Sequence, residues 1–526
     1  MVGRLPNITE SDMQNQQRQS IGGNLAAKRT DFSSLGRFLV KKIGRLVWIV
    51  ALVTAPVMCA QMLAEEQGLA SSRIPAEHLQ KYSDLAVQWM QEYLRVDTTN
   101  PPGNEMRAVA FYKRILDQEG IENRVFEYTP GRGDLWARIP ANTHVSEQQG
   151  EAGHPRPIVL LNHMDVVTSD ASHWKVPPFS GELKDGYLWG RGAQDMKDEG
   201  LAQLVVMVML KREKVALDRD VIFLAVSDEE VDDTGTDWFI AHQRDLLGNA
   251  EFLINEGGEN LLEGSKVKYV GVDVGEKTTY WLKVVAHGRP GHGSRPNPDS
   301  APDRLVRALN RIIAYQTPLR VLPVVEEFLR DMAQYEPPER AAEYRDIRKA
   351  IEDKKFQEEV ERDESLNFLL RDTISLTMMG GSGQTNVIPP EAWANLDVRI
   401  LPGGDPKAVL EAVRRVVNDP NVSVEPMRDE FNVANYSGTD NALFAAIREV
   451  AGKYFPGTPV VPHITSGYTE NQRYRPLGIN AYGFNPYTAT ADEGNTEHGN
   501  DERIRVEEVR RGPRILFDVV VAVAGQ

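Results

Sequence analysis

The sequence predicts an α/β fold, in which a mostly parallel sheet is flanked by helices and a smaller α+β domain is inserted. Two observations predict this fold. From about residue 75 to residue 276, apolar runs of strand length alternate with helical patterns, as expected of a parallel sheet covered on both faces. After Gly275 the patterns become those of half-exposed strands, and the first alternation resumes from about Tyr436. A domain inserted within another is the simplest interpretation of this order.

Length and composition set limits on the class of protein. A chain of 526 residues is long enough for two or more cores. The formal net charge of −16 makes nucleic acid and anionic membranes poor candidates for partners. Cys59 is the single cysteine, so disulfides within the chain and cysteine-rich metal sites are excluded. Any metal ion would have to be held by His, Asp and Glu.

The first 64 residues have a composition of their own. Basic residues between Arg37 and Arg45 precede an apolar run at residues 46–60, as in a secretory signal. The run is short for a membrane span of about 20 residues. No A-x-A cleavage site follows, and the polar lead is long for a signal peptide. We therefore expect export to the periplasm or the medium, with an uncleaved N-terminal membrane anchor as the alternative.

The elements follow in order along the rest of the chain. Residues 77–96 carry apolar residues at helical spacing, and "NPPGNE" then ends that helix. A second helical pattern covers residues 197–213, and strand-like runs occupy residues 124–128, 158–161, 221–226 and 252–254. In the smaller domain we expect strands at 278–288, 373–379, 392–400 and 422–426, helices from Asp303 and over 405–417, and a charged helical insertion at 337–363. The expected domain bounds are 75–276 and 429–526 for the main domain and 277–428 for the inserted one.

Acidic and imidazole side chains gather where the predicted strands of the main domain end. His163 and Asp165 close the strand at 158–161, Asp228, Glu229 and Glu230 follow the strand at 221–226, and Glu256 follows the next. Asp195 precedes a helix after a glycine-rich turn, and His498 lies in a polar loop. A solvated acidic rim would explain any one of these acids. Several strands ending in this way fit a cation site better, because ligands of open α/β sheets bind at the carboxyl ends of the strands.

Five fragments in this order resemble the co-catalytic zinc exopeptidases of metallopeptidase family twenty: "HMDVV", "GRGAQDMK", "SDEE", "NEGG" and "EHGNDE". This family includes carboxypeptidase S, aminoacylase, carnosinase and the ArgE/DapE deacylases. The resemblance runs from about Tyr82 to the C-terminus, and its wording is most similar to carboxypeptidase S. It implies a zinc-exopeptidase catalytic domain with an inserted, ferredoxin-like lid or dimerisation domain.

The resemblance also implies two zinc ions, for which cobalt or manganese could substitute. Asp195 would bridge the two ions, and Asp165 would orient His163. The remaining ligands would be His163 and Glu256 on one ion and Glu230 and His498 on the other. A cis peptide bond is implied between Asp195 and Met196.

The catalytic and substrate-binding roles follow from the same resemblance. Glu229 would be the general base, and His292 in "GRPGHGSRP" would stabilise the oxyanion of the tetrahedral intermediate. Asn386 and Arg399 resemble the groups that bind the free carboxylate of the substrate. The chain departs from the family in "SGYTENQRY", where Glu470 and Gln472 replace the usual Asp and Arg.

We therefore expect a zinc-dependent hydrolase of the carboxypeptidase or dipeptidase type, cleaving an amide bond next to a free α-carboxylate. An N-acyl-amino-acid deacylase shares this chemistry and stays open as an alternative. A non-catalytic binding module that has kept the fold is the alternative of another class. Expected partners are a small peptide or an N-acyl amino acid, and a second copy of the chain bound through the lid domain.

Overall fold

The computed structural model describes residues 68–142, 155–428, 435–465 and 467–526. The expectations for residues 1–64, an export signal or a membrane anchor, fall outside the described residues. Within the described ranges, no helix is both long enough and apolar enough to cross a membrane.

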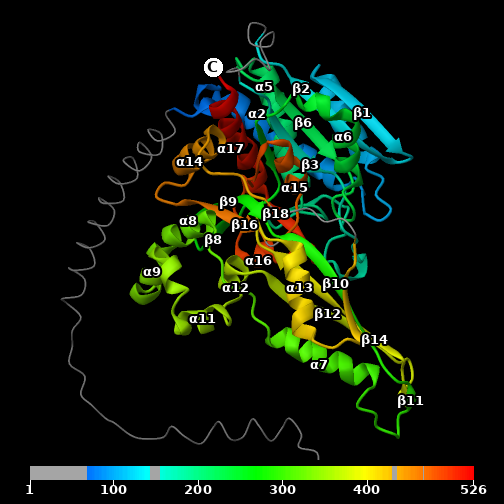
Figure 1. Cartoon of the computed structure of the whole chain (residues 1–526). Coiled ribbons are helices and arrows are strands. Elements are labelled where there is room, and N and C mark those ends of the chain that lie inside the picture. Colours follow the sequence, from blue (N-terminus) through cyan, green and yellow to red (C-terminus); the bar gives the residue numbers. More distant parts are fainter. Residues whose placement is uncertain (1–67, 143–154, 429–434, 466) are drawn as a thin grey trace, which may run out of the picture. The chain divides into compact units, whose positions relative to one another are not determined.

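A mixed sheet forms the centre of the described chain (Figure 1). Its order is β1-β2-β6-β3-β7-β17-β9-β16, and β8 pairs with β9. The central strands β6, β3, β7 and β17 are parallel, whereas β1 and β2 form an antiparallel edge. The strands are β1 (Glu122–Thr129), β2 (Arg132–Ile139), β3 (Ile158–His163), β6 (Val221–Val226), β7 (Phe252–Asn255), β8 (Asn260–Glu263), β9 (Lys266–Glu276), β16 (Val460–Thr465) and β17 (Asn480–Gly483). The predicted α/β class, with a parallel centre, is confirmed.

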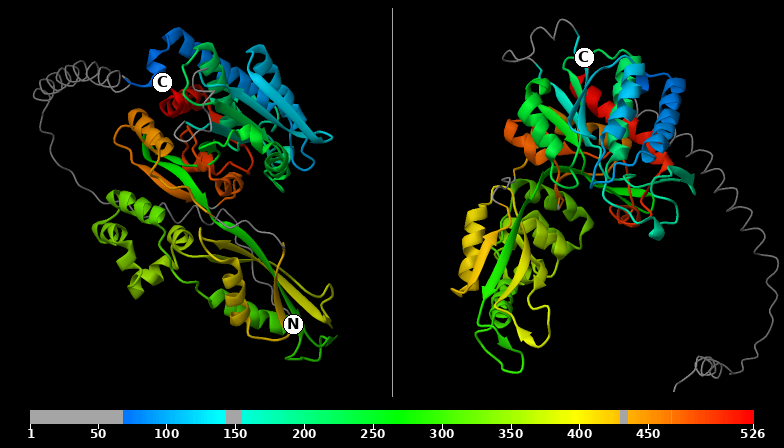
Figure 2. Two further views of the ribbon diagram at one scale, coloured as in Figure 1. Left: turned by 45° about the horizontal axis from the view of Figure 1, so that its top comes forward. Right: turned by 90° about the vertical axis from the view of Figure 1, so that its right-hand side faces the viewer.

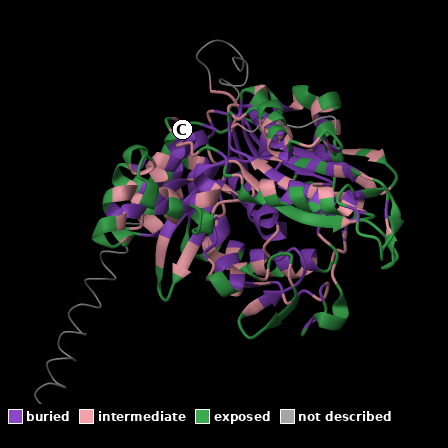
Figure 3. Cartoon of the chain, turned by 60° about the horizontal axis from the view of Figure 1, so that its bottom comes forward, coloured by how far each residue is buried: buried purple, intermediate pink, exposed green. Residues whose placement is uncertain are grey.

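Helices cover both faces of this sheet, which explains why the central strand β6 is apolar at every position. In β6, Phe223 and Ala225 pack in one hydrophobic cluster, whereas Leu224 and Val226 pack in another on the opposite face. The strands of this sheet are largely buried in Figure 3. The first cluster includes α2 (Ala76–Leu94), α3 (Met106–Gln118), α5 (Lys197–Arg212), α14 (Ala442–Tyr454) and α17 (Val506–Ala524), and the second includes α6 (Thr234–Gln243) and α15 (Asn471–Tyr474).

A second, antiparallel sheet has the order β12-β14-β10-β15 and a hydrophobic cluster of its own. Helices α7 (Ala301–Ala314) and α13 (Pro406–Val417) pack on one face of it. Its strands are β10 (Thr278–His287), β12 (Thr373–Gly380), β14 (Glu391–Ile400) and β15 (Val422–Pro426), and a ribbon of β11 (Gly291–His292) with β13 (Val387–Ile388) extends from it. The lower half of Figure 1 shows this sheet with α7 and α13 beside it.

The helical segment between α7 and β12 packs elsewhere. Its apolar side chains, such as Leu329, Ile347 and Phe356, belong to the same hydrophobic cluster as the main sheet. Within this segment α8 contacts β16. The helices are α8 (Pro323–Met332), α9 (Pro338–Arg345), α10 (Ile347–Ala350), α11 (Lys354–Val360) and α12 (Glu364–Leu370).

A single residue, Lys277, separates β9 of the main sheet from β10 of the smaller one, and this long green ribbon is visible in both views of Figure 2. The Lys277 side chain is fully buried. Its Nζ donates to the carbonyl of Arg371 at 2.8 Å and lies 4.2 Å from the centre of the Phe368 ring. Burial lowers the pKa of Lys277 to about 7. Because Arg371 lies between α12 and β12, this lysine joins two of the connections to the smaller sheet.

Candidate metal centre

The candidate ligands come together at the carboxyl ends of the central strands, where an α/β sheet binds its ligands. His163 is the last residue of β3, Glu229 and Glu230 follow β6, and Glu256 follows β7. Asp195 lies just before α5, and the peptide bond between Asp195 and Met196 is cis, as the resemblance implied. Gly200 lets α5 approach β3, since an added Cβ would lie 2.9 Å from Oδ1 of Asn162 in β3.

Asp195 lies between two imidazoles. Its Oδ1 is 2.9 Å from Nε2 of His163, and its Oδ2 is 2.7 Å from Nε2 of His498. The two histidines come from opposite ends of the domain sequence, yet one carboxylate contacts both. A carboxylate with one oxygen directed to each histidine has the arrangement of a ligand shared between two cations.

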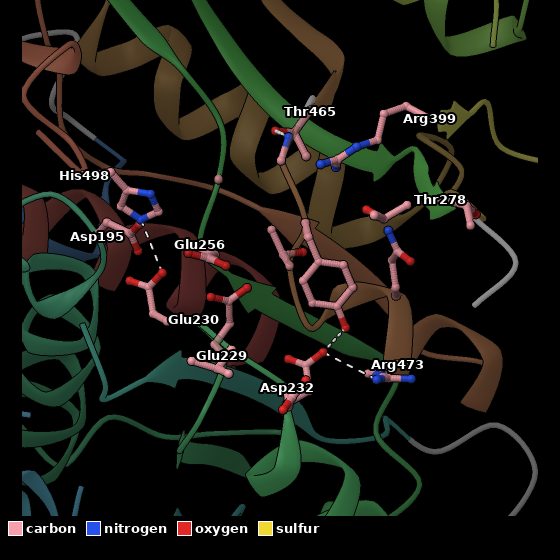
Figure 4. A pocket seen from close by; sticks show the side chains of 18 of the residues that line it. Asp195, Glu229, Glu230, Asp232, Glu256, Thr278, Arg399, Thr465, Arg473 and His498 are labelled. Atoms are coloured by element: carbon pink, nitrogen blue, oxygen red, sulfur yellow. Dashed lines mark hydrogen bonds and ion pairs between the residues drawn. The ribbon is translucent and has the colours of Figure 1, made fainter. Parts of the chain in front are cut away.

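Each histidine also has a second acidic neighbour. Glu256 Oε2 is 3.3 Å from His163 Nε2, and Glu230 Oε2 is 3.3 Å from His498 Nε2. A ligand atom of Glu229 lies within 4.8 Å of ligand atoms of His163 and Glu256. Figure 4 shows Asp195, Glu229, Glu230, Glu256 and His498 gathered at one side of a cavity. The structure therefore brings together all five predicted metal ligands and the predicted base.

The pKa shifts of these side chains show that their charges are unfavourable unless a cation lies among them. Burial, together with the charge of Glu256, raises the pKa of Glu229 well above its usual value, and burial also raises the pKa of Glu256. Hydrogen bonds to Asp195 and Glu230 raise the pKa of His498 to about 11. The Oε1 atom of Glu256 is buried without a hydrogen-bond partner among the described residues. Packed acids of this kind repel one another unless positive charge lies between them.

Asp165 contacts His163 mainly through its backbone, whereas the resemblance implied that its side chain orients the imidazole. Nδ1 of His163 is 3.0 Å from the backbone carbonyl of Asp165 and 3.7 Å from its carboxylate. The carboxylate accepts hydrogen bonds from the backbone N–H groups of Glu229 and Glu230, both at 3.2 Å, and from Nδ2 of Asn100 at 2.8 Å. The reason is that β3 ends at His163, so Asp165 lies outside the strand and faces the loop after β6.

Asp195, Glu229, Glu230, Glu256 and His498 line one side of a cavity of about 1000 Å³. Arg399 of β14 lines the same cavity, and its Nε donates to Asp397 at 2.8 Å. Arg399 and Thr278 lie across the cavity from His498 and Asp195 in Figure 4. A substrate that reaches both sides would therefore meet the candidate metal ligands on one side and a guanidinium on the other.

The structure does not bring His292 and Asn386 to this cavity, which neither residue lines. Both side chains are exposed at the β11–β13 ribbon, where the N–H of Gly293 donates to the Asn386 carbonyl at 2.8 Å. Figure 1 shows this ribbon at the far tip of the smaller sheet. Within one described chain, His292 is thus remote from the imidazoles and carboxylates of the centre.

Two features of the site were not anticipated from the sequence. The first is Asn100, which is buried and whose Nδ2 donates to both Asp165 and Asp228, the latter at 2.7 Å. It lies in "NPPGNE", which was interpreted only as the end of a helix. The available signal was a polar residue directly before two consecutive prolines.

The second feature is a set of contacts between the loop at residues 469–475 and the junction of β9 with β10. Arg475 forms a buried ion pair with Glu276, and Thr469 donates to the same carboxylate at 3.1 Å. Gln472 is buried and donates to the carbonyl of Lys277 at 3.2 Å. These pairs join residues nearly 200 positions apart, and no local pattern could have indicated them.

Comparison with known proteins finds a matching family and similar relatives. A family profile described as "Peptidase family M20/M25/M40" matches residues 159–522. The chain is 27% identical over 402 residues to "N-fatty-acyl-amino acid synthase/hydrolase PM20D1" of Mus musculus, covering 72% of this chain and 76% of that protein. It is 26% identical over 444 residues to "Aminoacylase-1" of Homo sapiens, covering 84% of this chain and 95% of that one.

A solved structure shares the fold. The M20 family metallo-carboxypeptidase Sso-CP2 from Sulfolobus solfataricus superposes with a TM-score of 0.60 at 19% sequence identity. The superposition covers 83% of this chain and 99% of that one. The arrangement of sheets and helices is therefore common to the two proteins.

Proposed function

Because the chain belongs to peptidase family M20/M25/M40, we propose that it hydrolyses an amide bond next to a free α-carboxylate with the help of two metal ions. As a member of this family it is a metal-dependent peptidase or N-acyl-amino-acid hydrolase. The observation that carries the finer proposal is the Asp195 carboxylate, which directs one oxygen to each of two histidines that have acidic neighbours of their own.

The residues present fit a pair of divalent cations. Imidazole nitrogens and carboxylate oxygens are the donors that zinc takes when cysteine is absent, and cobalt and manganese accept the same set. The unpartnered Oε1 of Glu256 and the raised pKa of its carboxyl group indicate a position that a cation would satisfy. His163 and Glu256 would hold one ion, Glu230 and His498 the other, and Asp195 both. Bound ions of this kind acidify water and polarise the scissile carbonyl.

Glu229 is the proposed general base. Its carboxylate lies within reach of the centre without being needed to complete either ligand set. It would take a proton from the attacking water and later deliver it to the leaving amine. Asp165 fixes the backbone N–H of both Glu229 and Glu230, so base and ligand are held by one buried carboxylate.

Arg399 is proposed to bind the free carboxylate of the substrate, because its planar guanidinium matches two carboxylate oxygens. His292 and Asn386 can act only if the smaller domain closes over a metal centre, either its own or that of a second copy of the chain. We propose that one of these arrangements brings His292 to the developing oxyanion, where a donor is worth about 2.7–4 kcal/mol.

The test combines metal analysis with turnover. Purified protein is loaded with zinc, cobalt or manganese and assayed on dipeptides and N-acyl amino acids. Glu229→Gln should keep both ions and lose at least about 10²-fold in kcat, as expected on loss of a general base. Asp195→Ala should lose both ions.

Glu497→Gln is the matched control, because this carboxylate lines the same cavity and has neither role. It should keep both ions and most of its activity. Normal turnover by metal-loaded Glu229→Gln, or two tightly held ions in Asp195→Ala, would contradict the assignments.

Export or membrane anchoring through residues 1–64 remains a separate proposal, supported by their basic cluster and apolar run. Fractionation of cells that express the full chain, compared with a chain starting at Gly68, tests it. Equal recovery of both chains in the cytoplasm would contradict it.

A further inference from the structure

Two large apolar side chains are exposed inside a cavity whose lining is otherwise rich in charge. Among the described residues, Val231 is 43% exposed and Trp281 is 40% exposed, and both line the cavity that contains the metal centre. Other exposed apolar residues, such as Ile313, do not line it. An indole left in water inside a binding cavity gains contact area when an apolar group covers it.

The position of Val231 follows from its neighbours in the sequence. It directly follows Glu229 and Glu230, the proposed base and one of the proposed ligands. Its side chain lines the same cavity as those two carboxylates, and in the proposed function the scissile bond lies next to them. An apolar group attached close to that bond is the part of a substrate that can reach Val231.

Trp281 is placed by the register of the smaller sheet. In the antiparallel pair of β10 with β14, Thr279 is opposite Arg399 and Trp281 is opposite Asp397. Opposed residues, and residues two apart, project from the same face of a sheet. Trp281 therefore shares a face with Arg399, about 7 Å further along the strand.

Arg428 brings the two apolar residues to the same part of the cavity. Its guanidinium lies 3.3 Å from the carboxylate of Asp232, the neighbour of Val231, and 5.2 Å from the centre of the Trp281 ring. Arg428 and Asp232 are both exposed, so their pair contributes little to stability and can open for a ligand. In Figure 4, Asp232 and Arg399 lie at separate edges of the cavity.

We infer that Val231 and Trp281 form an apolar subsite for the acyl side of the substrate. This inference rests on the proposed function, in which Arg399 holds the carboxylate on the amine side of the scissile bond. The acyl side begins at the scissile bond, and Val231 and Trp281 bound the part of the cavity beside Asp232 and Arg428, which the acyl side can enter. The chemistry required is an apolar group, supplied either by the acyl chain of an N-acyl amino acid or by an apolar residue of a peptide.

The experiment compares chain length on one leaving group. Initial rates of leucine release are measured for N-acetyl-, N-butanoyl- and N-octanoyl-leucine, and in a second series for Gly-Leu and Phe-Leu. With the wild-type chain, kcat/KM should rise at least about tenfold from acetyl to octanoyl, since a methylene in an apolar pocket is worth about tenfold or more.

Trp281→Ala and Val231→Thr should each remove most of that rise while they keep the metal content. Ile313→Ala, which alters an exposed apolar residue outside the cavity, should keep the full rise in kcat/KM. Dissociation constants of the same acyl-leucines, measured with metal-loaded Glu229→Gln, should show the same dependence on chain length without turnover. A rise in the peptide series alone would assign the subsite to a peptide residue.

Four outcomes overturn the inference. The first is equal kcat/KM for the acetyl and octanoyl substrates together with equal kcat/KM for Gly-Leu and Phe-Leu. The second is a Trp281→Ala variant that keeps the full rise in kcat/KM from acetyl to octanoyl. Equal losses on acetyl and octanoyl substrates would assign Trp281 to general structure instead. If the metal-loaded wild-type chain hydrolyses none of these substrates, the proposed function itself fails, and the inference fails with it.

Discussion

Replacing Asp165 by Asn tests whether this buried carboxylate organises the metal centre. The wild-type side chain accepts three hydrogen bonds and is fully buried. An Asn at this position has one acceptor oxygen and one NH₂ group, so the NH₂ must face at least one of the donors that the carboxylate accepts. At least one buried donor therefore loses its acceptor.

The size of the effect follows from that count. A buried donor left without a partner costs about 1–3 kcal/mol. At about 1.4 kcal/mol for each factor of ten, a midpoint of about 2 kcal/mol corresponds to roughly thirtyfold. This agrees with the 10–100-fold loss typical when groups that orient metal ligands are changed.

The loss of metal affinity should differ between the two ions. Asp165 holds Glu230 through a backbone N–H, whereas His163 contacts the Asp165 backbone carbonyl, which the substitution leaves in place. Asp165→Asn should therefore weaken the ion held by Glu230 and His498 by about 10–100-fold and spare the ion held by His163 and Glu256. At limiting metal, the stoichiometry should fall from two ions toward one.

Competition with a chromogenic chelator measures the affinity of the protein for each ion. The value of kcat/KM at saturating metal shows whether Glu229 is still correctly positioned. Asp170→Asn is the control, since Asp170 is an exposed carboxylate that likewise accepts a backbone N–H, from Ser172. Affinities and kcat/KM of Asp165→Asn within twofold of this control would refute the reasoning. Equal weakening of both ions would show that the carboxylate supports the whole centre.

Three further predictions concern the smaller domain and its junction. Arg399→Ala should raise KM for substrates with a free carboxylate and spare amidated analogues, and equal losses on both would show that Arg399 does not bind that group. His292→Ala should lower kcat with metal content intact, because a donor to the oxyanion acts only in the transition state; a variant with wild-type kcat would contradict this role. Lys277→Met should raise Tm more at pH 6 than at pH 9. The folded chain must bury an ammonium group below its pKa of about 7, whereas the unfolded chain keeps that group protonated to about pH 10, so the penalty shrinks as pH rises. A Tm difference that does not change with pH would contradict the cause given for the lowered pKa.

The sequence predicted the centre of the main sheet because buried parallel strands are continuous apolar runs. Residues 221–226 are apolar at every position, and three acids follow them after Ser227. β9 was not predicted, although it is a long strand. It contains Gly271 and Gly275, which weaken a strand pattern. The structure explains Gly275, since an added Cβ would lie 2.7 Å from the Tyr436 side chain.

The packing partner of a helix is harder to predict than the helix itself. The charge-laced pattern at residues 337–363 correctly indicated helices, because its apolar residues recur at helical spacing. That spacing shows which face of a helix is buried, but it contains no information on the element that buries it. Phe356 and Ile347 lie between strands of the smaller sheet in sequence, and they pack in the cluster of the main sheet.

At Gln472 the sequence departs from the family pattern, and a contact with a residue distant in sequence explains what this side chain does. The resemblance implied Arg at this position, whereas Gln472 is neutral and donates to the carbonyl of Lys277. Together with the buried pair of Arg475 and Glu276, it ties this loop to the junction between the two sheets. The segment thus has a structural use for its polar groups, and Arg399 on the smaller sheet is the proposed carboxylate-binding group. A change in the backbone angle at Lys277 would move this proposed carboxylate site relative to the metal centre, so the proposed closure of the smaller domain would be coupled to selection of the substrate.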